Sequence, residues 1–374
     1  MKRSRIMMAV LVLGVMSGNV SGETAEERLT YLEKEVLDLK NKKSSTGALS
    51  KVDLGGYGEL HYNNLSGRGG ASDSEKVDFH RFVIYMGYDF NDRVRFNSEL
   101  ELEHALSGDG APGEVELEQA YIDFDLNDDY IFRGGLFLLP IGIINETHEP
   151  TTFYGVERNS VEKNIIPTTW WEAGAGMHGG ITEDLFYSVY IHSGLMTSTN
   201  TSYSVRSGRQ KVAKANASDL AATIALKWSI PGITVGGAIQ YQSDITQGSD
   251  PDAGGALLGE LHADLHKGPL GLRALYAEWA LDGKGPDSMG SNKQYGWYVE
   301  PSFRPIDSVG VFARYSVWNN QAGSEGTDGE KTEYHVGINW WPYEQVVLKA
   351  DYQWQDNANG EEQDGFNLGM GYDF

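Results

Sequence analysis

The chain has 374 residues, of which 53 are acidic and 30 are basic, and it contains 46 glycines, 20 tyrosines and no cysteine. The net charge of -23 disfavours nucleic acid as a partner. The lack of cysteine excludes disulfides, thiolate metal sites, haem attachment through CxxCH and a lipidated cysteine. This composition suits an exported protein of a Gram-negative periplasm or outer membrane better than a small disulfide-bonded fold.

Residues 1–22 are predicted to be a secretory signal peptide. They consist of the basic start MKRSR, the apolar run IMMAVLVLGVM and the small residues SGNVSG. The apolar run is too short to cross a membrane as a helix. We therefore exclude this segment from the analysis of the fold.

Residues 23–50 are predicted to form a short periplasmic coiled-coil helix followed by a hinge. Leu29, Leu32, Val36 and Leu39 alternate at spacings of three and four, which is a heptad seam. The seam covers roughly two and a half heptads, too few for a stable helix in isolation. Either the helix joins copies of the chain that are already close together, or it lies on the surface of its own chain or contacts peptidoglycan.

From Val52 onward the sequence alternates with a period of two. In EQVVLKADYQWQ, for example, Val346, Leu348 and Tyr352 share one face, and Lys349 and Asp351 share the other. The alternation predicts sixteen strands, near residues 52–62, 77–90, 93–105, 115–126, 130–139, 168–178, 184–194, 219–229, 233–242, 256–266, 269–281, 293–304, 308–318, 331–341, 345–355 and 365–374.

The connections between these strands alternate between short turns and long polar loops. Asn91–Asp92 and 230–232 are typical short turns, and 195–218 is a typical long loop. This alternation predicts that residues 51–374 form an all-β, 16-stranded antiparallel transmembrane β-barrel, with its apolar face toward lipid. A soluble β-sandwich gives no reason for such a division. Aromatic residues near strand ends fit interfacial girdles; they are Trp228, Tyr241, Trp340, Tyr352 and Trp354.

Several pieces of the chain carry a family resemblance. They are, in order, DFHRFVIYMGYDFNDRVRFNSELELE, YIFRGGLFLLPIGIINE, PTTFYGVERN, HKGPLGLRALYAEW, YHVGINWWP and the terminal Phe374. Over most of the chain from about Val52, this series resembles the phosphate-selective porin O and P family of outer-membrane proteins. The resemblance implies a homotrimeric, sixteen-stranded porin. It also implies that the outer-membrane assembly machinery recognises the terminal strand through its last aromatic residue.

The sequence departs from that family at one position that matters for selectivity. The family strand before the long loop usually reads like GQFKxPFG, whereas this chain has Gly135 to Pro140 as GLFLLP, with Leu138 at the lysine position. Phosphate selectivity therefore cannot be carried over through that residue.

The face opposite the apolar face is expected to line the lumen, and its charge is mainly negative. Glu99, Glu101 and Glu103 form a ladder with a spacing of roughly 7 Å. Carboxylates along a narrow aqueous passage favour cations, although these residues could instead pair with Arg93 and Arg95. The predicted lumen-wall set is Arg93, Arg95, Glu99, Glu101, Glu103 and Arg314.

The longest connection, about residues 140–167, follows the fifth strand. A connection of this length in a compact domain is usually functional, and the family resemblance implies that it folds inward and narrows the barrel. Its predicted channel-facing residues are Glu146, His148, Glu149, Glu157, Arg158, Glu162 and Lys163. A second long loop carries Arg206, Arg209, Lys211 and Lys214, which we interpret as a solvated tip or a contact to lipopolysaccharide rather than an anion site.

No catalytic constellation emerges. His192 and Ser193 are strand neighbours and face opposite sides. Glu260, His262, Asp264 and His266 share a face but are too far apart for one ion, so we expect no metal and no cofactor. The sequence predicts an outer-membrane porin, not an enzyme, that passes small hydrophilic solutes and ions with a mild preference for cations. The alternative is a specific channel for phosphate or another oxyanion.

Overall fold

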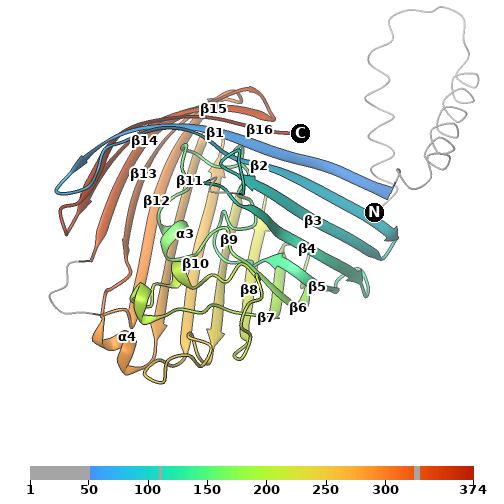
Figure 1. The fold of residues 1–374 in the computed structure, drawn as a ribbon. Helices are drawn as coiled ribbons and strands as arrows, with labels where there is room; N and C mark the ends of the chain where they lie inside the picture. The colour runs from blue at the N-terminus through green and yellow to red at the C-terminus, as the bar shows by residue number, and fades with distance from the viewer. Residues whose placement is uncertain (1–50, 109–111, 324–328) are drawn as a thin grey trace, which may run out of the picture. The chain divides into compact units, whose positions relative to one another are not determined.

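The structure, a computed structural model, describes residues 51–108, 112–323 and 329–374. Within this part of the chain, sixteen antiparallel strands close into one β-barrel (Figure 1). The predicted signal peptide, 1–22, and the predicted coiled-coil segment and hinge, 23–50, lie outside the described residues. Among the described residues, no helix is both long enough and apolar enough to cross a membrane.

All sixteen predicted strands are present, and each one pairs with its neighbours in chain order. Their bounds are β1 Val52–Arg68, β2 Ser74–Asn91, β3 Val94–Glu103, β4 Val115–Asp125, β5 Ile131–Leu138, β6 Trp171–Gly180, β7 Leu185–His192, β8 Ala221–Ile230, β9 Ile233–Gln242, β10 Ala256–Lys267, β11 Leu270–Leu281, β12 Lys293–Ile306, β13 Val309–Asn319, β14 Lys331–Tyr343, β15 Val346–Asn357 and β16 Glu362–Asp373.

The first and last strands pair with each other and close the barrel. Their register runs from Tyr57 opposite Asp373 to Arg68 opposite Glu362. Closure leaves no strand edge with unpaired backbone N–H and C=O groups, which a hydrocarbon environment could not satisfy.

The first and last long loops are shorter than the sequence predicts. β1 continues to Arg68 rather than to residue 62, and β16 begins at Glu362 rather than at 365. Here the ladder continues with polar residues on both faces, and Arg68 pairs with Glu362 at 2.8 Å. The apolar alternation that marks a strand in lipid ends before the strand does, because polar side chains are favoured on either face once the strand is in water.

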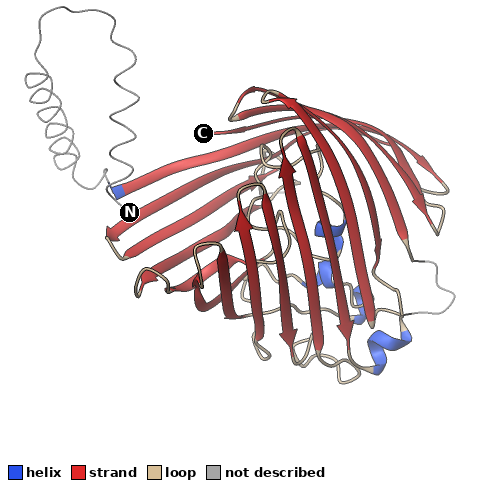
Figure 2. Cartoon of the chain, turned by 180° about the vertical axis from the view of Figure 1, so that it is seen from behind, coloured by secondary structure: helices blue, strands red, loops and turns tan. Residues whose placement is uncertain are grey.

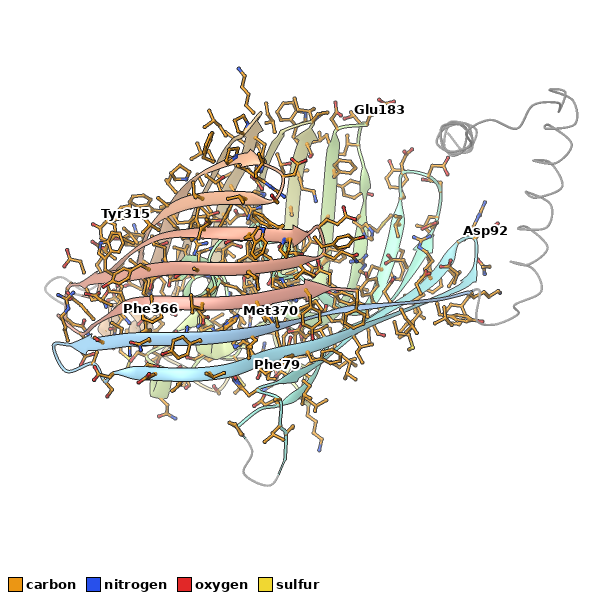
Figure 3. The ribbon with its side chains drawn as sticks, turned by 90° about the horizontal axis from the view of Figure 1, so that it is seen from above. Phe79, Asp92, Glu183, Tyr315, Phe366 and Met370 are labelled. Carbon is orange, nitrogen blue, oxygen red and sulfur yellow. The ribbon has the colours of Figure 1, made fainter. Side chains whose placement is uncertain are left out.

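The outer face of the barrel is apolar, as predicted. Leu100, between the buried Glu99 and Glu101, has 46% of its surface exposed. Figure 3 shows Phe366 and Met370, which share one face of β16, on the outside of the wall. Aromatic rings also form an unbroken series across four neighbouring strands, with centroids 4.9–5.4 Å apart; they are Trp297, Tyr315, Tyr334 and Trp354.

The barrel interior is occupied by loops rather than by wall side chains alone. Residues 139–170, which include the short helix α3 (Val161–Asn164), lie inside the ring of strands (Figures 1 and 2). Residues 193–220, with the 3₁₀ turns η2 (Thr199–Thr201) and η3 (Val205–Gly208), also enter the interior, whereas α4 (Lys284–Ser288) lies in the connection to β12. Apolar residues of both inward segments join wall residues in one buried cluster, including Ile141, Ile165, Trp170, Leu195, Tyr203, Trp279 and Tyr298.

Arginine on the outer face should destabilise the barrel according to its depth. Leu261, in the middle of β10, is 69% exposed, and Leu270, beside a short turn, is 60% exposed. We expect Leu261→Arg to reduce the free energy of unfolding by about 2–4 kcal/mol and Leu270→Arg by about 0–1 kcal/mol. Urea titration in lipid vesicles, with the folded fraction read from gel migration before and after boiling, measures both. Equal losses for the two variants would contradict a lipid-facing surface.

Candidate functional site

The segment 139–170, called the inward loop below, is bound to the wall on several strands. On one side, Trp279 Nε1 of β11 donates a 2.9 Å hydrogen bond to the Ile165 carbonyl. Arg314 of β13 donates to the Tyr154 carbonyl at 2.6 Å. These bonds hold the backbone of the inward loop, so its path is set by the wall as well as by its own sequence.

Carboxylates of the last three strands anchor the inward loop from the other side. Glu333 accepts a 2.7 Å bond from the Ser160 hydroxyl, and Asp351 accepts a 2.7 Å bond from the Val156 N–H. Asp373 accepts a hydrogen bond from the Thr151 hydroxyl. The loop also packs directly on β16, where a Cβ at Gly371 would lie only 2.4 Å from Pro150 Cβ. Much of the wall's negative charge therefore holds the loop in place.

A third anchor joins the inward loop to β3 and β4 through His148. His148 Nε2 lies 3.3 Å from carboxylate oxygens of Glu99 and Glu118, and all three side chains are at most 2% exposed. Burial alone would lower the pKa of His148, but the charges of Glu99 and Glu118 outweigh it and raise the pKa well above its ordinary value. Without another cation in this group, His148 is therefore protonated and makes ion-pair contacts with the Glu99 and Glu118 side chains.

A β-bulge in β4 brings Glu118 to this position. The register with β3 shifts between Glu99 and Leu100, so that Glu99 lies opposite Gln119 while Glu101 lies opposite Glu116. If side chains alternated strictly along β4 and Asp123 pointed inward, Glu118 would point outward. The extra residue of the bulge allows both to face the interior.

Glu162 is an internal anchor of the inward loop and does not face a passage. It is fully buried and accepts hydrogen bonds from the backbone N–H groups of Ile143 and Ile144, at 3.0 and 2.7 Å. It also accepts a 2.9 Å bond from the Tyr298 hydroxyl of β12. Burial raises the pKa of Glu162, while the hydrogen bonds from Ile144 and Tyr298 oppose that rise.

A charged cavity of about 180 Å³ lies at the long-loop end of the barrel, between β1–β4 and the inward loop. Three of the predicted channel-facing residues, Glu157, Arg158 and Lys163, line it. Desolvation opposes the charge on Glu157, but the hydrogen bond and charge of His61 hold the pKa of Glu157 below its usual range, so it is ionised. The carboxylates on this cavity are Glu59, Glu101, Glu103, Glu116, Glu118 and Glu157, and the fixed cations are Arg81, Arg158, Lys163, Arg206 and Arg209.

Two cations on this cavity come from the second inward segment, which the sequence analysis placed at a solvated tip. Arg206 donates a 2.5 Å bond to the Thr168 carbonyl, and Arg209 donates a 2.6 Å bond to the Thr169 carbonyl. Of the other two basic residues in this loop, Lys214 is exposed, and Lys211 forms ion pairs with Glu114 and Glu116. The interpretation as a solvated tip is therefore wrong for Arg206, Arg209 and Lys211.

Two larger cavities lie at the short-turn end of the barrel. One has a volume of about 680 Å³ and is lined by Glu146 of the inward loop together with Arg133, Lys227 and Asp264. The other, of about 300 Å³, is lined by Arg273, Arg304 and Trp341. The inward loop thus separates charged spaces on its two sides.

The other residues predicted to line the lumen or to face the channel either form ion pairs or hydrogen bonds or lie at the surface. Arg95 pairs with Asp125 of β4 at 2.5 Å, and Arg314 donates to Glu300 at 2.6 Å. Arg93 is exposed in the short turn after β2, and Glu149 accepts a bond from Tyr85 at 3.2 Å. Neither Arg93 nor Arg95 contacts the Glu99–Glu103 ladder, where Glu101 instead lies 3.9 Å from Arg81.

Several residues of the site were not identified from sequence. Arg81 pairs with Glu59 in the buried wall, and His61 binds both Glu59 and Glu157. Glu116 and Glu118 alternate in VELEQ, which was a visible signal, but the bulge concealed their direction.

Solved structures of outer-membrane proteins share this fold. The fold is that of outer-membrane channels: DcaP of Acinetobacter baumannii aligns with a TM-score of 0.62 and 12% identity, over 86% of this chain and 97% of that chain. OmpF of Salmonella typhi, solved in complex with daunomycin, aligns with a TM-score of 0.61 and 12% identity, over the same two shares. OmpT of Vibrio cholerae in its trimer form has a TM-score of 0.56 and 11% identity, over 86% of this chain and 99% of that chain.

Sequence comparison identifies the family. The model of phosphate-selective porin O and P matches residues 52–374, and the chain belongs to that family. An uncharacterized protein of Aquifex aeolicus (strain VF5) is 30% identical in an alignment of 352 positions that covers 86% of this chain and 80% of that protein. Family and fold together indicate a porin channel of the outer membrane rather than an enzyme.

Removing the Glu162 carboxylate should loosen the inward loop. Glu162→Ala leaves two backbone N–H groups and the Tyr298 hydroxyl buried without acceptors, at about 1–3 kcal/mol each. Hydrogen–deuterium exchange of residues 139–170 should therefore rise by at least tenfold, since every 1.4 kcal/mol is a factor of about ten. Glu146→Ala, in the same loop but exposed at the larger cavity on its other side, is the matched control and should exchange as the wild type does. If the control loosens the loop equally, Glu162 is not the anchor.

Proposed function

We propose that this porin forms a water-filled passage for small hydrophilic solutes and ions, with a mild preference for cations. In this proposal residues 51–374 are the channel domain and the inward loop is its constriction. The observation that supports it is the charged cavity between that loop and β1–β4, together with the two larger cavities on the loop's other side, which are also lined in part by charged residues. Spaces lined by ionised groups are hydrated, and apolar solutes gain nothing by entering them.

The balance of free charge favours cations. Six carboxylates line the 180 Å³ cavity against five fixed cations. The pair of Arg81 with Glu59 removes one charge of each sign, so the excess is one carboxylate. The surrounding low-dielectric wall focuses the field of the excess carboxylate and raises the local concentration of cations. The excess is small, so the preference is mild.

The arrangement across the cavity has a direction. Glu103 and Glu116 lie on the β3–β4 wall, whereas Arg158, Lys163 and Arg209 come from the inward segments. Acidic groups on one side and basic groups on the other create a field across the passage, which orients dipolar solutes and passes both signs of ion. This supports a general diffusion channel rather than a one-ion filter.

For the assembly, we propose a homotrimer embedded in outer-membrane lipid and lipopolysaccharide. The structural neighbour OmpT was solved in a trimer form, and the broad apolar outer face supports contact with lipid or with another copy. The signal peptide and the N-terminal helix, which would join copies or contact peptidoglycan, belong to the same proposal. Native gel migration with and without residues 24–43 tests whether that helix contributes to assembly.

Planar-bilayer recordings under a salt gradient test the selectivity. The wild type should give a reversal potential of cation-selective sign. The double variant Glu103→Gln/Glu157→Gln removes two carboxylates from the cavity and should move the reversal potential toward anions, while Arg93→Gln, in the exposed short turn, should leave it unchanged. A wild type with anion-selective reversal would refute the cation preference, and folded protein without conductance would refute the channel.

One observation favours the alternative of a phosphate or oxyanion channel. Arg158, Lys163, Arg206 and Arg209 meet on one side of the cavity, and guanidinium groups bind phosphate oxygens through paired hydrogen bonds. Against this, Arg158, Arg206 and Arg209 already donate to Thr169 and Thr168.

Current block by phosphate distinguishes the two functions. On the main proposal, micromolar phosphate blocks the wild type no more than chloride does. On the alternative, phosphate blocks selectively, and Arg158→Gln/Arg209→Gln weakens the block at least tenfold. Lys214→Gln, on the exposed part of the loop that carries Arg209, is the control and should leave the phosphate block unchanged on either proposal.

A further inference from the structure

Three fully buried side chains converge where the inward loop meets the wall, and none of the proposed channel functions requires them to do so. Glu99 comes from β3, Glu118 from the bulge of β4 and His148 from the inward loop. One potential ligand atom from each lies within 4.8 Å of the others. Two carboxylates packed around one imidazole in a dry interior are costly, and the neighbouring cation Arg81 is bound to Glu59 and to the His148 carbonyl.

The atoms that face the centre of this group make no hydrogen bond, and their only contacts are the ion-pair contacts with one another. They are Glu99 Oε1, Glu118 Oε2 and His148 Nε2, and each is buried. His148 Nε2 lies 3.3 Å from each of the two oxygens. Buried polar atoms are nearly always hydrogen-bonded, so three unpartnered atoms aimed at one point indicate a bound group.

Two of the three residues are oriented by bonds through their other polar atoms. His148 Nδ1 lies 3.1 Å from the Asn145 carbonyl, a contact in which the ring N–H donates, leaving the Nε2 lone pair directed at the centre. Gln119 Nε2 donates a 2.7 Å bond to Glu99 Oε2. A histidine that donates its second ring N–H to a carbonyl, beside a carboxylate held by an outer hydrogen bond, is the arrangement usual around protein-bound metal ions.

We propose that Glu99, Glu118 and His148 bind one zinc ion and that the ion fastens the inward loop to the β3–β4 wall. Two carboxylates and one neutral imidazole balance the charge of a divalent ion. Ligands of tetrahedral zinc lie roughly 3.4 Å apart, given bonds of about 2.1 Å, which agrees with the 3.3 Å separations. Three protein ligands including a nitrogen do not suit calcium, which takes six to eight oxygens. Water would supply the fourth ligand.

The ion would have a route to this site, because Glu118 also lines the 180 Å³ cavity. This proposal departs from the expectation that the chain binds no metal. That expectation rested on residues of a single strand, Glu260 to His266, whereas the ligands proposed here come from three separate segments.

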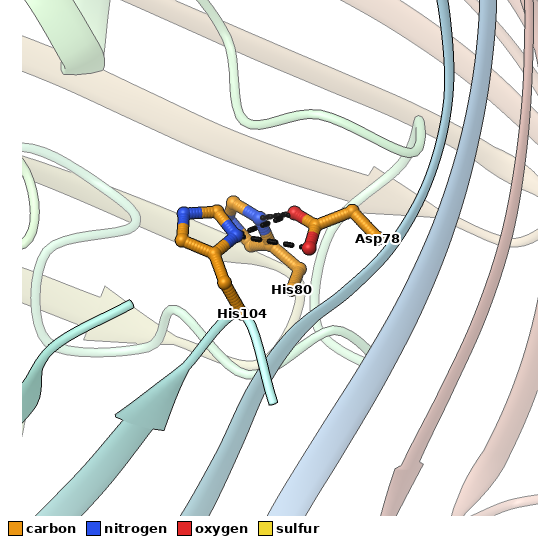
Figure 4. A group of neighbouring side chains, drawn as sticks. All are labelled: Asp78, His80 and His104. Carbon is orange, nitrogen blue, oxygen red and sulfur yellow. Dashed lines mark hydrogen bonds and ion pairs between the residues drawn. The ribbon is translucent and has the colours of Figure 1, made fainter. Parts of the chain in front are cut away.

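A second group on the same wall serves as an internal comparison. Asp78 and His80 of β2 lie with His104 beyond β3, and Figure 4 shows the Asp78 carboxylate to one side of both rings, with a nitrogen of each ring directed toward it. Here the potential ligand atoms already bond one another: His80 Nδ1 lies 3.1 Å and His104 Nδ1 2.8 Å from Asp78 Oδ2. Their side chains are also 26–36% exposed. This group is satisfied without an ion, so we do not assign zinc to it.

Metal content of the whole protein tests the proposal. Full-length protein is refolded in detergent with equimolar zinc, washed with EDTA, and the zinc per folded chain is measured by mass spectrometry. The wild type should retain about one zinc, Glu118→Gln and His148→Gln should each lose at least nine-tenths of it, and Asp78→Asn/His104→Gln should retain it. Gel migration before and after boiling confirms that each variant is folded.

A spectrum of the wild type keeps the test decisive if the buried variants fail to fold. X-ray absorption at the zinc edge should show one imidazole with oxygen ligands at about 2.0–2.2 Å. Two imidazoles would assign the ion to the Asp78 group and overturn the proposal. A folded wild type that retains no zinc would overturn it too.

Discussion

The closed hydrogen-bond ladder between β1 and β16 is the constraint on which the rest of the structure depends. In hydrocarbon no water can satisfy a free N–H or C=O, so sixteen strands must form a ring without an edge. The strand period of two then sends every second side chain inward. With many apolar side chains committed to lipid, much of the inner face of the wall is polar, and the buried apolar cluster is built jointly by the loops and by wall residues such as Leu258, Leu275 and Trp279.

The inward loop fills that interior, and the wall's charges hold it there. Ile141, Ile165 and Trp170 pack with Trp279 of the wall in a buried cluster. Around this cluster, ionic and polar wall groups bind the loop backbone and its hydroxyls, including Arg314, Glu333, Asp351 and Asp373. Part of the charge that alternation places on the inner face is therefore used to anchor the loop. The charge left for a passing solute is concentrated at one cavity beside β1–β4.

Some differences between prediction and structure have a single local cause. One extra residue in β4 reverses the alternation, and this brings Glu116 and Glu118 inside together with Asp123. A bulge leaves no mark in composition and little in pattern, because its residues can be read as an ordinary strand on either face. Similarly, β1 and β16 extend past the apolar alternation, because the signal for a strand in lipid disappears where the strand enters water.

The sequence by itself determined the sixteen strands, their order and the two classes of connection. These follow from residue period and turn length, which are local properties of the chain. Only the tertiary structure decided which charges meet. His148 reaches Glu99 and Glu118, and Glu157 reaches His61, because the inward loop crosses the barrel and contacts strands far away in sequence. It also decided that Arg206 and Arg209 turn inward, since their carbonyl partners belong to a different loop. Contacts between segments depend on the path of each loop in three dimensions, which no short stretch of sequence contains.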